Sequence, residues 1–168
     1  MTKPPYSRLQ IILHWTMALL FVSNYLLSDG MGDFFQRYLE GDASWSDWAV
    51  SSHIYVGVAF LLFAVVRMAI RPNPNPAGAD ENAQPLHERL AGRVHNILYL
   101  LMFIGPVAGM SALYAKTEIL GQFHHLLMNF MLAIIAIHLV AMLYHQFILK
   151  DKLLSRMSLF KQFSRRNS

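Results

Sequence analysis

The chain has 168 residues, of which 55% are hydrophobic and only 14% are charged, whereas a soluble domain usually has about a quarter charged residues. This composition argues against a soluble globule, and the formal net charge of +4 points to nucleic acid or to an anionic membrane surface. The absence of cysteine excludes disulfides, thiolate catalysis, Cys-ligated zinc and iron–sulfur clusters, which draws attention to the eight histidines.

Four apolar stretches follow one another along the chain, at residues 9–27, 48–70, 97–114 and 123–149. A membrane-spanning helix needs about 20 mostly apolar residues, so each stretch predicts one span, and the longer fourth is expected to tilt or to project past the lipid. No small-residue cleavage site follows the first stretch, so we interpret it as a retained helix. The sequence therefore predicts an all-α bundle of four transmembrane helices, a single membrane domain over residues 1–168.

Polar segments connect these spans. Pro72-Asn73-Pro74-Asn75-Pro76 opens the connection between the second and third spans, and prolines at this density favour extended, solvated backbone. Residues 28–47 and 115–122 are expected to form the other two connections. Within the third span, Gly105-Pro106 and Gly109 predict a kink or a close contact with another helix, both of which membrane bundles tolerate.

Positive charge is asymmetric between the two ends of the predicted bundle. Twelve of the 14 Lys and Arg residues lie at the end that holds both termini and the connection between the second and third spans. The other end holds Arg37 and Lys116 among six acidic residues, which are Asp29, Asp33, Glu40, Asp42, Asp47 and Glu118. Because positive residues stay on the cytoplasmic side, both termini are expected to be cytoplasmic. The net positive charge of the chain then reflects its orientation in the membrane, and no nucleic-acid partner is expected.

Six histidines lie inside the apolar stretches: His14, His53, His124, His125, His138 and His145. An ionisable residue within a span is costly and is a functional candidate by default, although a single one can simply bond to a neighbouring helix. Six together are harder to explain by packing alone. His124 and His138 are 14 residues apart, which places them within about 40° of the same face and about 21 Å apart along one helix.

Each of these two imidazoles needs a counterpart on another helix. His53 lies a few residues inside the second span on the acidic side, level with His124, and His14 lies a few residues inside the first span on the basic side. Two histidines from facing helices are the axial ligands that haem iron needs, whereas zinc prefers a tighter cluster with carboxylate or thiolate ligands. The spans hold no acidic residue, and the chain has no Cys-x-x-Cys-His motif for covalent attachment. The spacing therefore predicts two non-covalent b-type haems stacked across the membrane.

The partner of His14 is open to two interpretations. Counted inward from Lys150, His145 lies about as deep as His14, whereas His138 lies 7 residues further along, or roughly 10 Å deeper. His145 also lies within about 20° of the face that carries His138. From spacing alone, either His138 or His145 can complete the second pair.

A set of residues ordered along nearly the whole chain carries a resemblance. Its members are Tyr6-Ser7-Arg8-Leu9-Gln10, His14-Trp15, His53, Gly57, Arg67, Arg71, His95, Tyr99, Pro106, Gly109, His124, His138, His145 and Lys150-Asp151. No single motif among them is strong, but the ordered set is specific. It resembles the bacterial cytochrome b561 family, small four-helix di-haem proteins of the inner membrane.

The resemblance implies an assignment of the axial ligands to the two haem irons. His53 and His124 would hold a periplasmic haem, and His14 and His138 would hold a cytoplasmic one. With His138 as the ligand, His145 is free for another role at the cytoplasmic interface.

By the same resemblance that role is quinone chemistry, with ubiquinone as the acceptor. A quinone needs hydrogen bonds to its carbonyls and a proton route on reduction, for which His145, titratable near neutrality, and Arg8 are candidates. Arg67 and Arg71, spaced i, i+4, could bind a haem propionate, and His95 could contact one too. Membrane anchoring explains the two arginines about as well.

The resemblance implies electron transfer across the membrane between a periplasmic donor and the quinone pool. Superoxide is one implied donor, which favours an oxidoreductase, although the acidic outer end does not help to attract an anion. The alternative is a non-catalytic cytochrome b subunit that serves a periplasmic redox protein, and a third interpretation is a haem-free scaffold with packed histidines. His125 is expected to face outward, and His87 has no assigned role.

Overall fold

The computed structural model describes residues 7–46, 48–71, 86–148 and 150. This part of the chain forms five helices and no strand. They are α1 (Arg8–Leu26), α2 (Met31–Glu40), α3 (Trp48–Ala69), α4 (Leu86–Ala115) and α5 (Glu118–Phe147). All of them except α2 are long and apolar enough to cross a membrane, which confirms the prediction of an all-α fold with four spans. The Pro-rich segment 72–76 and the tail after Lys150 lie outside the described residues.

The third and fourth spans belong to helices that are longer than their apolar stretches. The sequence places the third span at 97–114, but α4 begins at Leu86, and the fourth span, expected at 123–149, belongs to a helix that begins at Glu118 and ends at Phe147. An apolar run marks the part of a helix that lies in lipid, whereas the helix itself continues into its polar flanks. The expected connection 115–122 shrinks accordingly to Lys116 and Thr117, with Lys116 in the left-handed region at φ 50°.

A capping box begins α1. The Ser7 hydroxyl accepts from the backbone N–H of Gln10, and the Gln10 side chain accepts from the backbone N–H of Ser7, so two donors at the helix start are satisfied. Gln10 also donates from its side chain to the carbonyl of Ile70, over 3.1 Å. This bond ties the start of α1 to the residue that follows α3.

The short helix α2 is a correction to the sequence analysis, which expects residues 28–47 to be a plain connection. Its two flanking glycines, Gly30 at φ 77° and Gly41 at φ 84°, adopt the left-handed conformation that favours glycine. The helix buries Phe34, and the Tyr38 hydroxyl donates to the backbone carbonyl of Leu113 in α4. The apolar residues of α2 recur at the spacing of an amphipathic helix, i, i+3, i+4, i+7 and i+8: Met31, Phe34, Phe35, Tyr38 and Leu39. The sequence therefore carries a signal for α2, but a search for long apolar spans does not detect it.

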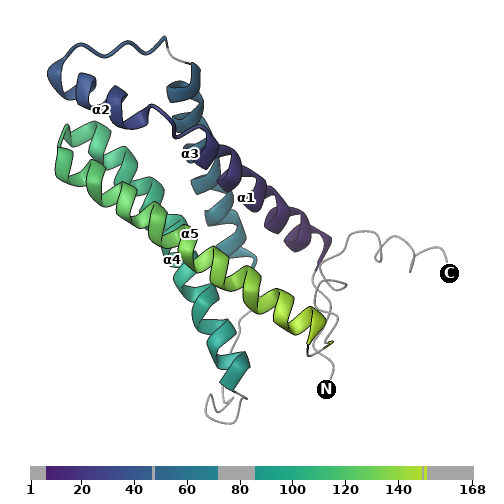
Figure 1. The fold of residues 1–168 in the computed structure, drawn as a ribbon. Coiled ribbons are helices and arrows are strands. Elements are labelled where there is room, and N and C mark those ends of the chain that lie inside the picture. The colour runs from purple at the N-terminus through teal and green to yellow at the C-terminus, as the bar shows by residue number, and fades with distance from the viewer. Residues whose placement is uncertain (1–6, 47, 72–85, 149, 151–168) are drawn as a thin grey trace.

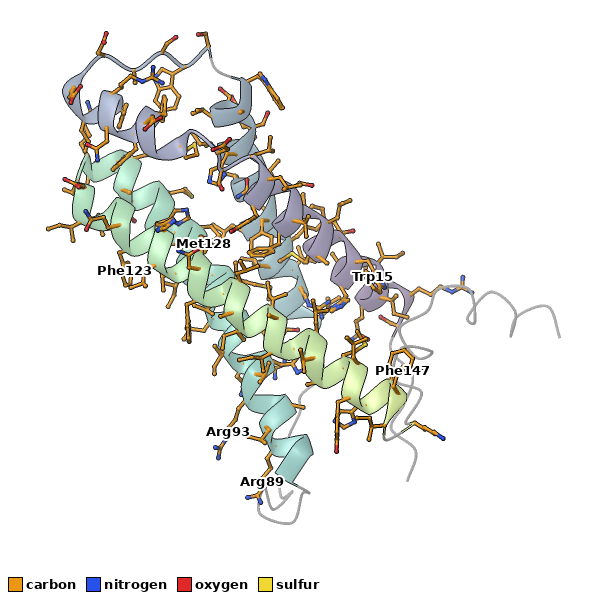
Figure 2. The ribbon with its side chains drawn as sticks, in the orientation of Figure 1. Trp15, Arg89, Arg93, Phe123, Met128 and Phe147 are labelled. Carbon is orange, nitrogen blue, oxygen red and sulfur yellow. The ribbon has the colours of Figure 1, made fainter. Side chains whose placement is uncertain are left out.

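The spanning helices pack as two connected pairs. α1 lies against α3, α5 lies against α4, and α3 joins the pairs through its contact with α4. Figure 1 shows α2 lying across one end of the bundle, beside the turn between α4 and α5. We call this the α2 end. At the opposite end α1 begins and α5 ends, and Figure 2 shows Arg89 and Arg93 projecting from α4 there. We call this the basic end.

An apolar core occupies the middle of the bundle, between the two ends. It consists of Met17, Phe21, Phe60, Ala64, Leu101, Met131 and Ile134. Many other large apolar side chains of the spans are exposed on the outer surface, among them Leu19 at 68% and Leu62 at 64% exposure. Exposed apolar surface of this kind is what a bundle presents to lipid. The interior at the middle of the bundle is therefore built for packing, and the histidine clusters lie on either side of it.

Two glycines of α4 allow α5 to approach closely. A Cβ on Gly109 would lie 3.0 Å from Cε1 of His124, and a Cβ on Gly105 would run into the end of the Met128 side chain, which is labelled on α5 in Figure 2. α4 continues through Pro106 as one helix. The close contact that the sequence predicts at this point is present in the structure.

Candidate functional site

Two histidines face each other near the α2 end. His53 lies near the start of α3 and His124 near the start of α5, and the centres of their rings are 6.4 Å apart with the ring planes at 84°. Both side chains are half-buried. The structure thus brings together the first pair that the sequence analysis predicts. We call His53 and His124 the α2-end pair.

The hydrogen bonds of the α2-end pair determine which ring nitrogen is available. Nδ1 of His53 lies 3.1 Å from the backbone carbonyl of Asn24, and Nδ1 of His124 lies 2.9 Å from the carbonyl of Gly105. A carbonyl can only accept, so each Nδ1 carries the proton and donates. In a neutral imidazole the lone pair is then on Nε2. This is the form in which histidine binds a metal, with its other nitrogen anchored.

The spacing of the α2-end pair suits a single metal atom held between two imidazoles. With metal–nitrogen bonds of about 2 Å on both sides, two ring centres would be roughly 6 Å apart, close to the observed separation. Around the pair, Gly109 leaves room for the His124 ring. Among the described residues, the side-chain oxygen of Asn24 is buried without a hydrogen-bond partner. These residues fit a metal with two axial sites, as haem iron has.

Three histidines gather at the basic end, from three different helices. His95 of α4 and His138 of α5 have ring centres 5.0 Å apart, with the ring planes at 83°. His14 of α1 is close enough to interact electrostatically with both. We call these residues the basic-end cluster. Within the described part of the chain, no group of three or more His, Asp or Glu side chains is arranged to hold a metal ion by itself.

Arg67 of α3 controls the state of His14. One guanidinium nitrogen of Arg67 lies 3.2 Å from Nδ1 of His14, and another donates over 3.2 Å to the carbonyl of Gln10. Because arginine only donates, Nδ1 of His14 accepts, and in the neutral ring the proton is on Nε2. His14 therefore differs from the α2-end pair, and Arg67 has to release Nδ1 before Nε2 of His14 can bind a metal.

A second arginine adds to the positive charge at the basic end. Arg71 lies over the ring of Tyr99, with its guanidinium carbon 4.6 Å from the ring centre, and Arg67 is 5.9 Å from the same centre. Arg71 also donates to the Asn96 side chain over 2.7 Å. Both guanidinium groups thus gather at Tyr99 beside the basic-end cluster. Such groups bind carboxylates through paired, charge-assisted hydrogen bonds.

The remaining predicted site residues lie near the end of α5, at the start of α1 and on the exposed face of α5. His145 lies two turns beyond His138 on α5, half-buried, with its ring centre 6.2 Å from that of Tyr144. Arg8 is the first residue of α1 and is half-buried at the same end. His125 is exposed, as expected. The structure thus places His138 in the basic-end cluster and His145 closer to the end of α5.

Some residues that contribute to the two histidine sites were not predicted from the sequence to do so. Asn24 and Gly105 act through backbone carbonyls, which any residue carries, so no sequence signal reveals this role, although Gly105 was predicted to take part in a helix contact. Asn96 is a polar residue at the border of an apolar stretch, and its position beside His95 could have been noticed. The contact of Arg67 with His14 joins residues of different helices, so only the fold reveals it.

Comparisons with known proteins find a matching family model and relatives that align along most of the chain. The model of the family described as prokaryotic cytochrome b561 matches residues 5–158. The chain is 31% identical to a protein named cytochrome b562 from Cereibacter sphaeroides, in an alignment that covers 92% of this chain and 96% of that one. It is 27% identical to a probable superoxide oxidase CybB from Yersinia pestis, with 90% and 94% covered.

Proposed function

This chain belongs to the prokaryotic cytochrome b561 family, and from this premise we propose that it transfers electrons across the bacterial inner membrane between a periplasmic donor and ubiquinone. Membership supports membrane electron transfer with b-type haem. The observation that carries the finer proposal is the presence of histidine sites at both ends of α5, one at His124 and one at His138. Two haems, one at each site, would divide electron transfer across the membrane into shorter steps.

The α2-end pair would hold the first haem through Nε2 of His53 and of His124. The backbone carbonyls of Asn24 and Gly105 keep both rings oriented and both Nδ1 atoms protonated. These anchors are backbone atoms, so they hold their positions as long as the helices do. When bound, haem supplies one-electron oxidation and reduction at its iron.

The basic-end cluster would hold the second haem through His14 and His138. Arg67 would exchange its bond with His14 for a propionate, which frees the His14 ring to rebind its proton on Nδ1. Arg71 is placed to bind a propionate as well, and His95 lies against His138. The pairing of His14 with His138 follows the family pattern, and the position of His138 within the cluster supports it.

Quinone would bind at the same end, nearer the end of α5. The His145 imidazole can donate a hydrogen bond to one quinone carbonyl, and Arg8 can donate to the other. His145 lies near the end of α5 and Arg8 at the start of α1, and both of these helix termini lie at the basic end (Figure 1). Reduction of one quinone to quinol takes two electrons and two protons, and the protons would arrive from the basic end.

Superoxide is the first candidate donor, supported by the relative named as a probable superoxide oxidase. Two superoxide ions would each give up one electron and leave as dioxygen, and one quinone would receive both electrons with two protons. The second candidate is a small basic redox protein. The observation that favours it is the exposed acidic group around α2, formed by Asp29, Asp33, Glu40 and Asp42. Such a surface attracts a cationic partner and repels an anion.

The test of the haem sites is haem content per chain. A reduced-minus-oxidised visible spectrum of the purified protein should show low-spin b-type haem at two per chain. His124→Ala should reduce this to one, His138→Ala should remove the other, and His125→Ala, the adjacent exposed residue, should retain both. A wild-type ratio of one, or no loss in His124→Ala, would contradict the assignment.

The test of the donor is rapid mixing of oxidised protein with each candidate. Superoxide should reduce the haems faster than spontaneous dismutation removes it, and added ubiquinone should reoxidise them. If superoxide fails but a small basic cytochrome reduces the haems, the chain is the electron-transfer subunit of the second candidate. If ubiquinone leaves reduced haem unchanged, the quinone part of the proposal is wrong.

A further inference from the structure

Two polar residues lie on the face of α5 that the bundle does not cover. His125 and Asn129 are one turn apart and both exposed. The amide nitrogen of Asn129 lies 3.4 Å from Nε2 of His125, longer than a usual hydrogen bond. This contact uses only the nitrogen of the Asn129 side chain, so its carbonyl oxygen takes no part in it.

The helical geometry directs Asn129 away from the bundle. At 100° per residue, Asn129 is about 160° from Met131 and about 140° from Ile134, the two buried residues of α5. The exposed residues Ala133 and Ala136 continue the same face toward the basic end, within about 40° of Asn129. We call His125, Asn129, Ala133 and Ala136 the α5 stripe.

The depth of Asn129 makes its exposure costly. α5 has 30 residues, about 45 Å, whereas the hydrocarbon core of a bilayer is about 30 Å thick. Asn129 is eleven residues from the start of α5, about 17 Å along the helix. With the helix centred in the bilayer, Asn129 lies within the hydrocarbon, where a side-chain amide finds no water to bind. Polar side chains at such positions typically bond across a contact with another helix.

We propose that the α5 stripe is the contact between two copies of this chain. Copies inserted the same way round are related by a twofold axis along the membrane normal, which brings each residue of the stripe to the same residue of the second copy. A carboxamide carries both a donor and an acceptor, so two Asn129 side chains satisfy each other. The small Ala133 and Ala136 let the helices approach closely. The inference does not depend on the proposed electron transfer.

The chain has no cysteine, so a single introduced cysteine reports the contact. Ala136→Cys in the full chain, in native membranes with its haem bound, should form a disulfide-linked homodimer on mild oxidation. Ile137→Cys is the matched control, because Ile137 is 54% exposed at nearly the same depth but about 100° around the helix. It should cross-link far less.

A second substitution tests the role of the amide. Asn129→Leu, added to Ala136→Cys, should lower the yield of homodimer by about threefold or more, as the loss of one such interhelical bond weakens association. The haem spectrum shows in each variant that the bundle is folded. Equal cross-linking at both positions, none at Ala136→Cys in folded protein, or an adduct with a different protein would overturn the proposal.

Discussion

The hydrogen bond at Nδ1 determines whether Nε2 of a histidine in this chain is free to bind a metal. His53 and His124 donate from Nδ1 to backbone carbonyls, so their Nε2 atoms are ready to bind a metal. His14 accepts at Nδ1 from Arg67, so its Nε2 is protonated. Residues that look equivalent in the sequence therefore start from different states, and the difference comes from their neighbours.

Gly109→Ala should damage the α2-end pair. The new Cβ would lie 3.0–3.1 Å from Cε1 and Nδ1 of His124, so the ring must shift and its bond to the carbonyl of Gly105 must weaken. We expect a lower content of one haem and an altered electron paramagnetic resonance signal for it. Gly92→Ala, where a Cβ meets nothing within 4 Å, is the control on the same helix. An unchanged signal in Gly109→Ala would show that the contact is not tight.

Arg67→Gln should change the potential of the haem proposed at the basic end. A positive charge beside the haem, as Arg67 would supply at a propionate, favours the reduced, less positive iron, so its removal should lower the midpoint potential of that haem. The expected drop is on the order of 50 mV, about a tenfold change in the one-electron equilibrium. A redox titration followed by visible absorption measures this, with Arg93→Gln, at an exposed position on α4, as the control. Equal shifts of the midpoint potential in the two variants would show that Arg67 has no specific effect at the haem site.

Among the elements, α2 depends most on tertiary contacts. Its ten residues are too few for a stable isolated helix. Phe34 anchors it with 1% exposure, stacked on Tyr38 and edge-on to Trp45 at 5.0 Å. The flanking glycines set where the helix begins and ends, Phe34 packs against Trp45, and Tyr38 bonds the helix to the carbonyl of Leu113 in α4.

Phe34→Ala should release α2 while the four spans stay folded. Truncation of a buried Phe costs about 3–5 kcal/mol, which corresponds to roughly a hundredfold or greater loss of protection against hydrogen exchange. Exchange measured by mass spectrometry should therefore accelerate in residues 31–40. Gln36→Ala, at an exposed position of the same helix, should leave it unchanged. Faster exchange throughout the spanning helices would mean instead that α2 is essential to the whole bundle.

The spanning helices were predictable because each needs a long apolar run, and the periodicity of a helix brings His124 and His138 to similar faces. The ends of α4 and α5 were not predictable from hydropathy, because helices continue into polar flanks. α2 was missed although Phe34, Phe35, Tyr38 and Leu39 follow the spacing of an amphipathic helix, because hydropathy alone does not mark a helix that is half polar. The bond from Arg67 to His14 and the position of His95 beside His138 depend on how separate helices pack, which spacing along one chain does not contain.

At the scale of the whole molecule, charge separates the two ends. The exposed acidic residues around α2 lie at one end, and the arginines at the starts of α1 and α4 and near the end of α3 lie at the other (Figure 1). The positive-inside rule then predicts that the α2 end faces the periplasm. In the proposed electron transfer, this orientation would decide which histidine site faces the donor and which faces the quinone pool.

Labelling of introduced cysteines tests this orientation, because the natural chain has none. In intact cells, a membrane-impermeant maleimide should label Ser44→Cys, beyond α2, and should spare Lys150→Cys, just beyond α5, until the membrane is permeabilised. Both positions are exposed. The reverse pattern would place the basic end outside and would contradict the proposed direction of electron transfer.

In the proposed electron transfer, the single helix α5 would set the distance between the two haem sites. His124 and His138 are close to four full turns apart, which is why both face the bundle. One inserted residue would turn one histidine about 100° away from its site, whereas four residues would add about 6 Å and turn it by only about 40°. Two histidines on the same face of α5 can therefore be moved apart or together only by about whole turns of the helix. Relatives adapted to thicker or thinner membranes would change this distance in steps rather than continuously.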